Sequence, residues 1–376
     1  MILDFVVNHT GYDHRWLNDP EKADWFHEQT PILSDNQENL ENGWLAGLPD
    51  LAQENPEVEQ YLFDTAEFWI SELGVDGFRL DTVKHVPKSF WETFVDHVKG
   101  LDPDFYMLGE VWTNNPQYIA EYEKTGIDSF VNYPMYETVV DTFKQPGQSL
   151  DPLFAIWERN KSVLERPEWL GNFIDNHDNQ RFIRTAIENQ QHPRTRLKLA
   201  LTYLYTAPGI PVIYQGTEIP MDGGEDPDNR RMVNFAAQDE ELRDYIKRLG
   251  ELRQRNPALR RGDFEQVYQE GAFSIFQRTY QDQTMLIAIN NDTEEHIGSI
   301  PGLEDGLQLR GLLHEDLIKQ TDEGEYKLAI QPETAEIYLV EEDEGLNWSL
   351  PILIVAVFSG FIWFVFMAGR KQKNKV

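Results

Sequence analysis

Short apolar runs alternate with amphipathic stretches from residue 1 to about residue 257. The run Ile2–Val7 is almost continuously apolar, as expected for a strand buried on both faces of a parallel sheet. Asn55 and Pro56 predict the start of a helix, since asparagine caps helices and proline suits their first turn, and Gly74 predicts its end. Repeated strand–helix units of this spacing are typical of a parallel (β/α) barrel.

The chain is therefore predicted to be an α/β protein of the (β/α)8 TIM-barrel type, with residues 1–9 and 51–260 forming the barrel. The predicted strands are Ile2–Val7, Gly77–Asp81, Tyr106–Val111, Ser129–Tyr133, Gly171–Asn176 and Pro211–Gln215. A closed barrel has eight strands, so the first two strands are predicted to be missing. No signal peptide is visible at residues 1–9, which also predicts a chain shortened at its N-terminus.

Two further folded segments are predicted. Residues 10–50 are polar and aromatic with little periodicity and are too long for a simple loop, which predicts an inserted small domain B. Residues 261–341 contain runs rich in β-branched residues separated by Asp, Asn, Gly and Pro, which predicts a C-terminal β-sandwich. Residues 342–347 form an acidic linker.

Residues 348–368 carry no charge and are long enough to cross roughly 30 Å of hydrocarbon as a transmembrane helix. Acidic residues precede this segment, and the tail 369–376 is basic. The positive-inside rule then predicts a single-pass protein of the cell membrane with a cytoplasmic tail and an extracellular catalytic domain. The alternative for this segment is a buried core helix.

The formal net charge of −32 argues against a nucleic-acid-binding protein, which needs a basic surface. Acidic surfaces favour solubility, and clustered carboxylates suit hard cations such as calcium. The chain has no cysteine, which excludes disulfides, thiolate nucleophiles and zinc sites built from cysteine.

Three acidic residues follow predicted strands. Asp81 and Glu110 lie at the ends of strands one βα unit apart, so they are expected at the same mouth of the barrel, and Asp178 follows a later strand. Retaining glycoside hydrolysis needs one carboxylate as nucleophile and a second as proton donor about 5 Å away. Arg79 points to the same side of its strand as Asp81 and would keep that carboxylate ionised. Each motif alone is more often structural, but the ordered set predicts cleavage of glycosidic bonds.

The residue sequences of these motifs resemble those of the α-amylases of glycoside hydrolase family 13. The four main signatures of that family are matched by D-F-V-V-N-H (Asp4–His9), G-F-R-L-D-T-V-K-H (Gly77–His85), G-E-V-W (Gly109–Trp112) and F-I-D-N-H-D (Phe173–Asp178). Two additional signatures are matched by L-P-D-L (Leu48–Leu51) and by Gly209–Glu218. The resemblance extends from residue 1 to about residue 340.

The resemblance implies a role for each matching residue. Asp81 would be the nucleophile, Glu110 the acid/base and Asp178 the transition-state stabiliser. Substrate contacts would come from His9, Arg79, Lys84, His85, His177, Asp226 and Arg230. The family's structural Ca²⁺ would be held by Asn8, Glu41, Asp50 and the backbone carbonyl of His85, although capping of strand ends is an alternative role for Asn8 and Asp50.

The predicted function is that of an α-amylase, a retaining hydrolase of internal α-1,4-glucosidic bonds in starch and maltooligosaccharides. Within the same family, a cyclomaltodextrinase or a glucanotransferase is the alternative. A non-catalytic, amylase-like ectodomain that binds carbohydrate is the alternative from a different class. Retention of all three acids counts against that last alternative.

Overall fold

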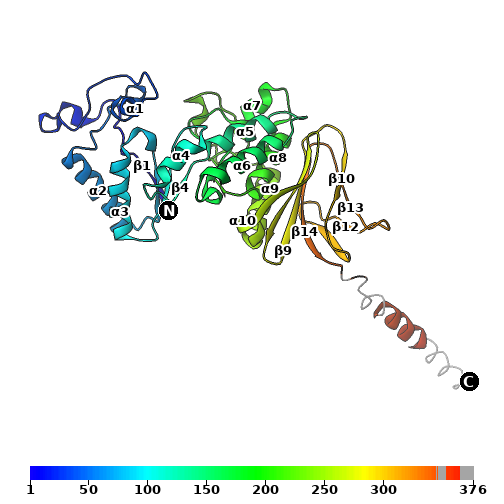
Figure 1. Cartoon of the computed structure of the whole chain (residues 1–376). Coiled ribbons are helices and arrows are strands. Elements are labelled where there is room, and N and C mark those ends of the chain that lie inside the picture. Colours follow the sequence, from blue (N-terminus) through cyan, green and yellow to red (C-terminus); the bar gives the residue numbers. More distant parts are fainter. Residues whose placement is uncertain (344, 346–352, 365–376) are drawn as a thin grey trace, which may run out of the picture.

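The computed structural model describes residues 1–343, 345 and 353–364 (Figure 1). Six parallel strands are present at the predicted places: β1 (Ile2–Phe5), β2 (Gly77–Leu80), β3 (Tyr106–Gly109), β4 (Ser129–Phe130), β5 (Gly171–Asn172) and β6 (Ile210–Pro211). β1 to β4 form one sheet in chain order, β5 pairs with β6, and a parallel bridge between Val131 and Gly171 joins the two sheets. Among the described residues, β1 and β6 are not paired with each other.

Each of these strands ends before the predicted limit, because the chain turns away from the sheet at the functional residues. Leu80 is the last paired residue of β2, and Thr82 adopts a left-handed conformation with φ of 47°. At the opposite end of the strand, Gly77 lies so close to β3 that a Cβ atom would stand 2.4 Å from the Tyr106 carbonyl oxygen. Only glycine fits this position, so Gly77 fixes how closely β2 and β3 approach.

Helices follow the strands and cover the outside of the sheet. The α-helices are α1 (Gln37–Asn42), α2 (Pro56–Ser71), α3 (Lys88–Leu101), α4 (Pro116–Glu123), α5 (Tyr133–Phe143), α6 (Asp151–Val163), α7 (Phe182–Glu188), α8 (Pro193–Thr206), α9 (Glu240–Arg255) and α10 (Pro257–Arg261). The short 3₁₀ helices are η1 (Arg15–Asn18), η2 (Pro20–Lys22), η3 (Leu45–Gly47), η4 (Val83–His85), η5 (Pro167–Trp169) and η6 (Asp228–Arg230). At the start of α2, the Asn55 side chain accepts a hydrogen bond of 2.9 Å from the amide of Glu57, as its capping role predicts.

The segment between β1 and α2 leaves the sheet and returns to it at one place. An antiparallel bridge pairs His9 with Asp50, and the amide of Thr10 donates to the carbonyl oxygen of Pro49. The segment contains α1 and several 3₁₀ turns, and Trp25 is buried within it. It therefore forms a wall beside the carboxyl ends of the strands.

The chain after α10 is antiparallel. Its strands are β7 (Asp263–Glu270), β8 (Phe273–Tyr280), β9 (Gln283–Asn290), β10 (His296–Ile300), β11 (Leu307–Gly311), β12 (Leu317–Lys319), β13 (Tyr326–Ile330) and β14 (Thr334–Glu342). Six of them form one sheet in the order β12-β11-β14-β9-β8-β7, and β10 pairs with β13. The six-stranded sheet buries one face against the β10–β13 pair and the other against helices that include α8 and α9 (Figure 1). A C-terminal sheet domain thus packs directly on the barrel helices.

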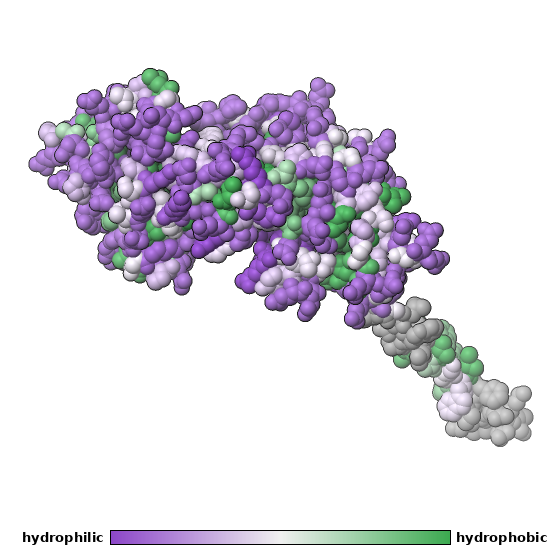
Figure 2. All heavy atoms as spheres, viewed as in Figure 1, coloured by the Kyte–Doolittle hydropathy of each residue, from purple (hydrophilic) through white to green (hydrophobic). Residues whose placement is uncertain are grey.

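The described part of the predicted transmembrane segment is a helix over residues 353–364, which projects from the body and is hydrophobic on its surface (Figures 1 and 2). No helix in the described ranges is both long and apolar enough to cross a membrane. Residues 348–352 and 365–368 of that segment, and the basic tail 369–376, lie outside the described residues.

Candidate active site

A cleft of about 600 Å³ opens at the carboxyl ends of the strands, between the sheet and the inserted segment. It brings together most of the predicted site residues, namely His9, Asp81, Lys84, His85, Glu110, His177, Asp178, Asp226 and Arg230. These residues come from five separate stretches of sequence, which only the barrel topology assembles. The inserted segment supplies the facing wall through Tyr12 and the turn around Ala46.

Arg79 joins the two carboxylates nearest the strands. Its Nη1 donates to Asp81 Oδ1 and, at 2.8 Å, to Asp4 Oδ1, while its Nη2 lies 2.6 Å from Glu110 Oε1. The predicted contact with Asp81 is therefore present, and the contact with Glu110 adds to it. One guanidinium holds both carboxylates close together and at fixed orientation.

Glu110 lies deepest in the site, with only 4% of its surface exposed. Its carboxylate accepts hydrogen bonds from the Tyr133 hydroxyl at 2.9 Å and from the Thr82 amide at 3.1 Å. Burial raises the pKa of Glu110, and the neighbouring charge of Asp81 raises it further, against the opposing effect of Arg79. A carboxyl group with a raised pKa retains its proton closer to neutral pH and can donate it.

Asp178 is held at the other side of the cleft by a cationic side chain. Arg230 Nη2 donates to Asp178 Oδ1 at 3.1 Å, and Arg230 Nε lies 2.7 Å from Asp226 Oδ1. His177 Nε2 lies 3.3 Å from Asp178 Oδ2. Asp178, Asp226, Arg230 and His177 thus form one polar group that faces Asp81 and Glu110 across the cleft.

Lys84, His85 and His9 line the remaining edge. Lys84 Nζ donates to the carbonyl oxygen of Trp112 at 2.8 Å, and this bond fixes the Lys84 side chain beside the segment that follows β3. Burial lowers the pKa of His85 to about 4 and also lowers that of His9, so both imidazoles are neutral at neutral pH. His85 is nearly buried, and its Nδ1 is 3.0 Å from the carbonyl oxygen of Leu40 in the inserted segment.

The predicted calcium ligands Asn8, Asp50 and Glu41 differ in their surroundings. Asn8 and Asp50 are fully buried, and in each side chain Oδ1 has no hydrogen-bond partner. Such orphaned buried oxygens fit a hard cation, because oxygen atoms are the ligands that Ca²⁺ prefers. Glu41 instead accepts a hydrogen bond of 2.6 Å from Gln37. In the part of the chain that the structure describes, no three His, Asp or Glu side chains converge as a metal site.

Tyr133 and Tyr12 are site residues that were not predicted from the sequence. Tyr133 was predicted to end a strand, whereas it begins α5 behind the Asn132 cap and directs its hydroxyl at Glu110. The signal for this was the Asn-Tyr-Pro sequence, a cap followed by proline in the first turn. Tyr12 is exposed, lines the cleft and donates from its hydroxyl to the Ala46 carbonyl oxygen at 3.1 Å.

Carboxylates grouped at the carboxyl ends of parallel strands, with one buried acid of raised pKa, are the arrangement of (β/α)-barrel glycosidases. The model described as "Alpha amylase, catalytic domain" matches residues 1–265, and the model described as "Alpha-amylase C-terminal domain" matches residues 262–338. The chain belongs to the alpha-amylase family, glycoside hydrolase family 13.

Two solved structures are similar over most of this chain. An alpha-amylase from Anoxybacillus is 55% identical with a TM-score of 0.89, covering 92% of this chain and 76% of that one. An alpha-amylase from Geobacillus thermoleovorans, solved in complex with acarbose, is 53% identical with a TM-score of 0.87, covering 91% of this chain and 77% of that one.

Curated relatives carry other names. The Beta/alpha-amylase of Paenibacillus polymyxa is 34% identical over 90% of this chain, and a Cyclomaltodextrinase of Thermoanaerobacter pseudethanolicus is 31% identical over 83%. The chain spans only 29% of the length of the first protein and 56% of the second.

The predicted localisation is contradicted. A relative from Bacillus subtilis, 30% identical, is named Intracellular maltogenic amylase, and the described residues contain no helix able to cross a membrane. The prediction of a single-pass membrane protein with an extracellular catalytic domain is therefore wrong; it rested on the apolar composition of residues 348–368 and on the charges that flank them.

Proposed function

We propose that this chain is a retaining glycosidase that cleaves α-1,4-glucosidic bonds, with Asp81 as nucleophile, Glu110 as acid/base and Asp178 as transition-state stabiliser. The observation that supports this most strongly is the guanidinium of Arg79, which contacts both Asp81 and Glu110. Retaining enzymes need their two carboxyl groups about 5 Å apart, and a shared cation favours this short separation over the longer one of inverting enzymes.

In this mechanism the two carboxyl groups play different roles because their surroundings differ. The cation of Arg79 stabilises the ionised form of Asp81, whose oxygen attacks the anomeric carbon. Burial favours the protonated form of Glu110, which donates its proton to the leaving glycosidic oxygen. Glu110 then takes a proton from the water that hydrolyses the glycosyl–Asp81 ester.

Asp178 would accept hydrogen bonds from hydroxyl groups of the attacked sugar. Its contact with Arg230 fixes the carboxylate in place, so that it is already oriented when the ring distorts. Lys84, on the opposite edge and held by the Trp112 carbonyl oxygen, would contact the leaving sugar.

For the substrate, we propose small α-glucans, meaning cyclomaltodextrins and short maltooligosaccharides, with hydrolysis as the main reaction. The relatives named cyclomaltodextrinase and maltogenic amylase support this choice. The cleft, at about 600 Å³, lies within the range of roughly 300–1,000 Å³ that is usual for small-ligand sites. Endo-hydrolysis of starch is the second candidate, because two solved structures that are 55% and 53% identical to this chain over the matched residues are named alpha-amylases.

We further propose a structural Ca²⁺ between the sheet and the inserted segment. Asn8 and Asp50 would supply the two orphaned side-chain oxygens, and the backbone carbonyl of His85 a third ligand. Glu41 is the weakest of the predicted ligands, since Gln37 already engages its carboxylate. When bound, the ion would neutralise the buried charge of Asp50 and join the base of the inserted segment to β1.

The test compares products from β-cyclodextrin, maltoheptaose and soluble starch. We expect the wild type to cleave β-cyclodextrin faster than starch, with the anomeric configuration retained in the first product by NMR. Asp81→Asn should lose activity by several orders of magnitude, whereas Asp104→Asn, an exposed aspartate at the far end of β3, should retain it. Equal activity of wild type and Asp81→Asn would refute the nucleophile assignment. Binding without cleavage by the wild type would support the carbohydrate-binding alternative.

A further inference from the structure

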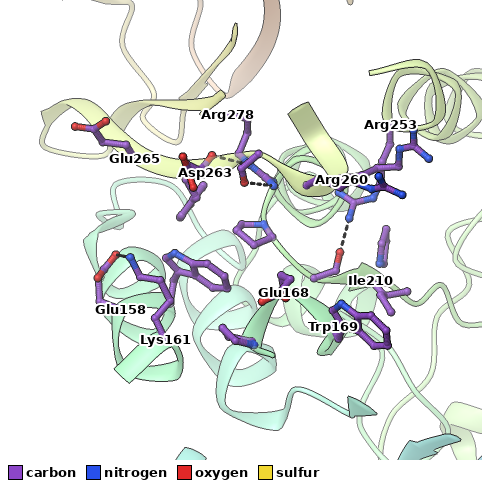
Figure 3. A pocket seen from close by; sticks show the side chains of 18 of the residues that line it. Glu158, Lys161, Glu168, Trp169, Ile210, Arg253, Arg260, Asp263, Glu265 and Arg278 are labelled. Atoms are coloured by element: carbon purple, nitrogen blue, oxygen red, sulfur yellow. Dashed lines mark hydrogen bonds and ion pairs between the residues drawn. The ribbon is translucent and has the colours of Figure 1, made fainter. Parts of the chain in front are cut away.

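A cavity of about 1220 Å³, larger than the cleft, lies at the opposite end of the parallel strands (Figure 3). Its wall includes Tyr106, the first residue of β3, and Ile210, the first residue of β6. The cleft lies beyond the other ends of the strands, and no residue lines both spaces. The cavity is therefore separate from the candidate active site.

The cavity lies where the barrel meets the C-terminal sheet domain. One wall comes from α6 and η5, and the facing wall comes from α9, α10, β7 and β8. In Figure 3, Glu168 and Trp169 lie on the first wall, and Arg253, Arg260 and Arg278 lie on the facing wall. A ligand in this cavity would contact both domains at once.

In the part of the chain that the structure describes, two guanidinium groups of the facing wall are largely buried and form no ion pair. Arg278 is 1% exposed, and its Nη2 donates to the Gly262 carbonyl oxygen at 2.9 Å. Arg253 Nη1 donates to the Leu259 carbonyl oxygen at 2.7 Å. Burial, and after it the charge of a neighbouring arginine, lowers the pKa of Arg278 to about 9 and that of Arg253 to about 10. Carbonyl oxygens satisfy the N–H donors but do not neutralise the charge, and buried charges in proteins are normally paired.

Two more guanidinium groups on the same wall are exposed. Neither Arg260 nor Arg261 forms a hydrogen bond or an ion pair through its side chain with any residue that the structure describes. The Lys, Arg, Asp and Glu side chains around the cavity comprise five cations and four carboxylates, and Lys161 is already paired with Glu158 at 2.7 Å. In a chain of net charge −32, this is a local excess of positive charge. Such a region attracts anions, and guanidinium groups bind phosphate and carboxylate oxygens through two N–H groups at once.

The first wall offers a flat aromatic surface opposite these cations. Trp169 is 40% exposed, and the guanidinium carbon of Arg166 lies 5.1 Å from the centre of its ring. Trp157, which is 8% exposed, packs edge to face against Phe264 with 6.1 Å between the ring centres. An exposed indole is a suitable stacking partner for the planar ring of a ligand.

We propose that this cavity binds a small ligand that joins a planar ring to an anionic group, as a nucleoside phosphate does. Trp169 would stack on the ring, and Arg260 and Arg261 would bind the phosphate oxygens. The phosphate charge would also offset the buried charges of Arg253 and Arg278. The volume exceeds the roughly 300–1,000 Å³ that is usual for small-ligand sites, so both parts of such a ligand fit at once. Nothing in this site depends on the proposed glycosidase reaction.

The test is isothermal titration calorimetry of the full chain with AMP, adenosine and inorganic phosphate. We expect AMP to bind about ten-fold or more tightly than adenosine, which lacks the charge, and than phosphate, which lacks the ring. Arg260→Gln and Arg261→Gln should each weaken AMP binding roughly ten-fold, the usual effect of losing one charge-assisted hydrogen bond. Trp169→Ala should weaken it about five-fold or more. Arg255→Gln is the matched control, because Arg255 is an exposed arginine of α9 that does not line the cavity. Melting temperatures without ligand establish that each variant is folded.

AMP binding that is absent, or no tighter than adenosine binding, would overturn the proposal. An affinity for AMP that is unchanged in both Arg260→Gln and Arg261→Gln would overturn it as well. Phosphate that binds as tightly as AMP would refute the stacking role of Trp169 and with it the proposed class of ligand. AMP binding that is lost in Lys84→Gln, a cation of the cleft, but kept in the two arginine variants would place the ligand in the cleft instead. Because the calorimetry uses no glucan, a failure of the proposed glycosidase function leaves these outcomes unchanged.

Discussion

Tyr133→Phe is the substitution that most directly tests how the acid is tuned. It removes one hydroxyl group, which donates to Glu110 Oε1 at 2.9 Å and accepts from Asn176 Nδ2 at 3.3 Å. The aromatic ring, which stacks on Trp112 at 5.1 Å between centroids, is retained. The variant therefore changes the hydrogen bonding of Glu110 while leaving the shape of the site intact.

The hydroxyl donates to the ionised form of Glu110, so its loss disfavours that form and raises the pKa of Glu110 further. A hydrogen bond to a charged group contributes about 1.5–3 kcal/mol. At 1.36 kcal/mol per pKa unit, its complete loss corresponds to roughly 1–2 units. Because Arg79 and the Thr82 amide still contact the carboxylate, we expect a rise of about one unit. The loss of a partner for Asn176 should cost about 1 kcal/mol of stability.

The assay is the pH dependence of kcat/KM on maltoheptaose, whose alkaline limb reports the pKa of the acid in the free enzyme. In Tyr133→Phe this limb should move to higher pH by about one unit. Tyr136→Phe is the matched control, because Tyr136 lies on the same helix and stacks on Phe173 at 4.6 Å without contacting Glu110. An alkaline limb that stays in place, or moves to lower pH, would refute the proposed tuning of Glu110.

Three further predictions concern the site and its scaffold. Arg79→Lys should lower kcat/KM roughly 100-fold, the usual effect of losing one charge-stabilising donor, because an ammonium cannot bridge two carboxylates as a guanidinium does. Arg231→Lys, outside the cleft, is the control. Similar losses of kcat/KM in both variants would contradict the bridging role of Arg79. Calcium at 100 times its Kd should stabilise the fold by about 2.7 kcal/mol, measured as a rise in Tm over EDTA-treated protein. Asp50→Ala should abolish that rise, and a calcium response that persists in it would refute the site. Gly77→Ala should destabilise the fold by roughly 1–3 kcal/mol in urea unfolding, since its Cβ would meet a carbonyl oxygen at 2.4 Å. Gly100→Ala, in open space on α3, should stabilise the fold by about 0.5–1 kcal/mol. Equal effects of the two substitutions would disprove the steric argument.

The order of the parallel strands could be predicted from sequence because each is an apolar run bounded by turn residues. Their ends could not, since hydrophobicity continues past the last paired residue: Val111 and Ile174 are buried although they follow β3 and β5. Burial there comes from packing around the strand ends rather than from the sheet itself. For the same reason Tyr133, in an apolar context, was interpreted as strand.

Site residues could be predicted where the end of a strand fixes their position. They could not be predicted where their position depends on contacts between distant segments. Asp81, Glu110 and Asp178 line one cleft, as their positions after strands suggested. The contact of Arg79 with Glu110 depends on the register of β2 with β3, which pairs Leu80 with Gly109 and which no local pattern specifies. Likewise, the engagement of Glu41 by Gln37 is decided by side-chain packing within α1.

The guanidinium shared by Asp81 and Glu110 couples the effects of substituting either residue. The charge of Asp81 raises the pKa of Glu110, so replacing Asp81 with asparagine both removes the nucleophile and leaves Arg79 free to stabilise ionised Glu110. The loss measured in that variant therefore includes a less protonated acid. Rate losses from Asp81 and Glu110 substitutions will not add, and only a double-mutant cycle with Arg79 separates the chemistry of each carboxylate from the charge that they share.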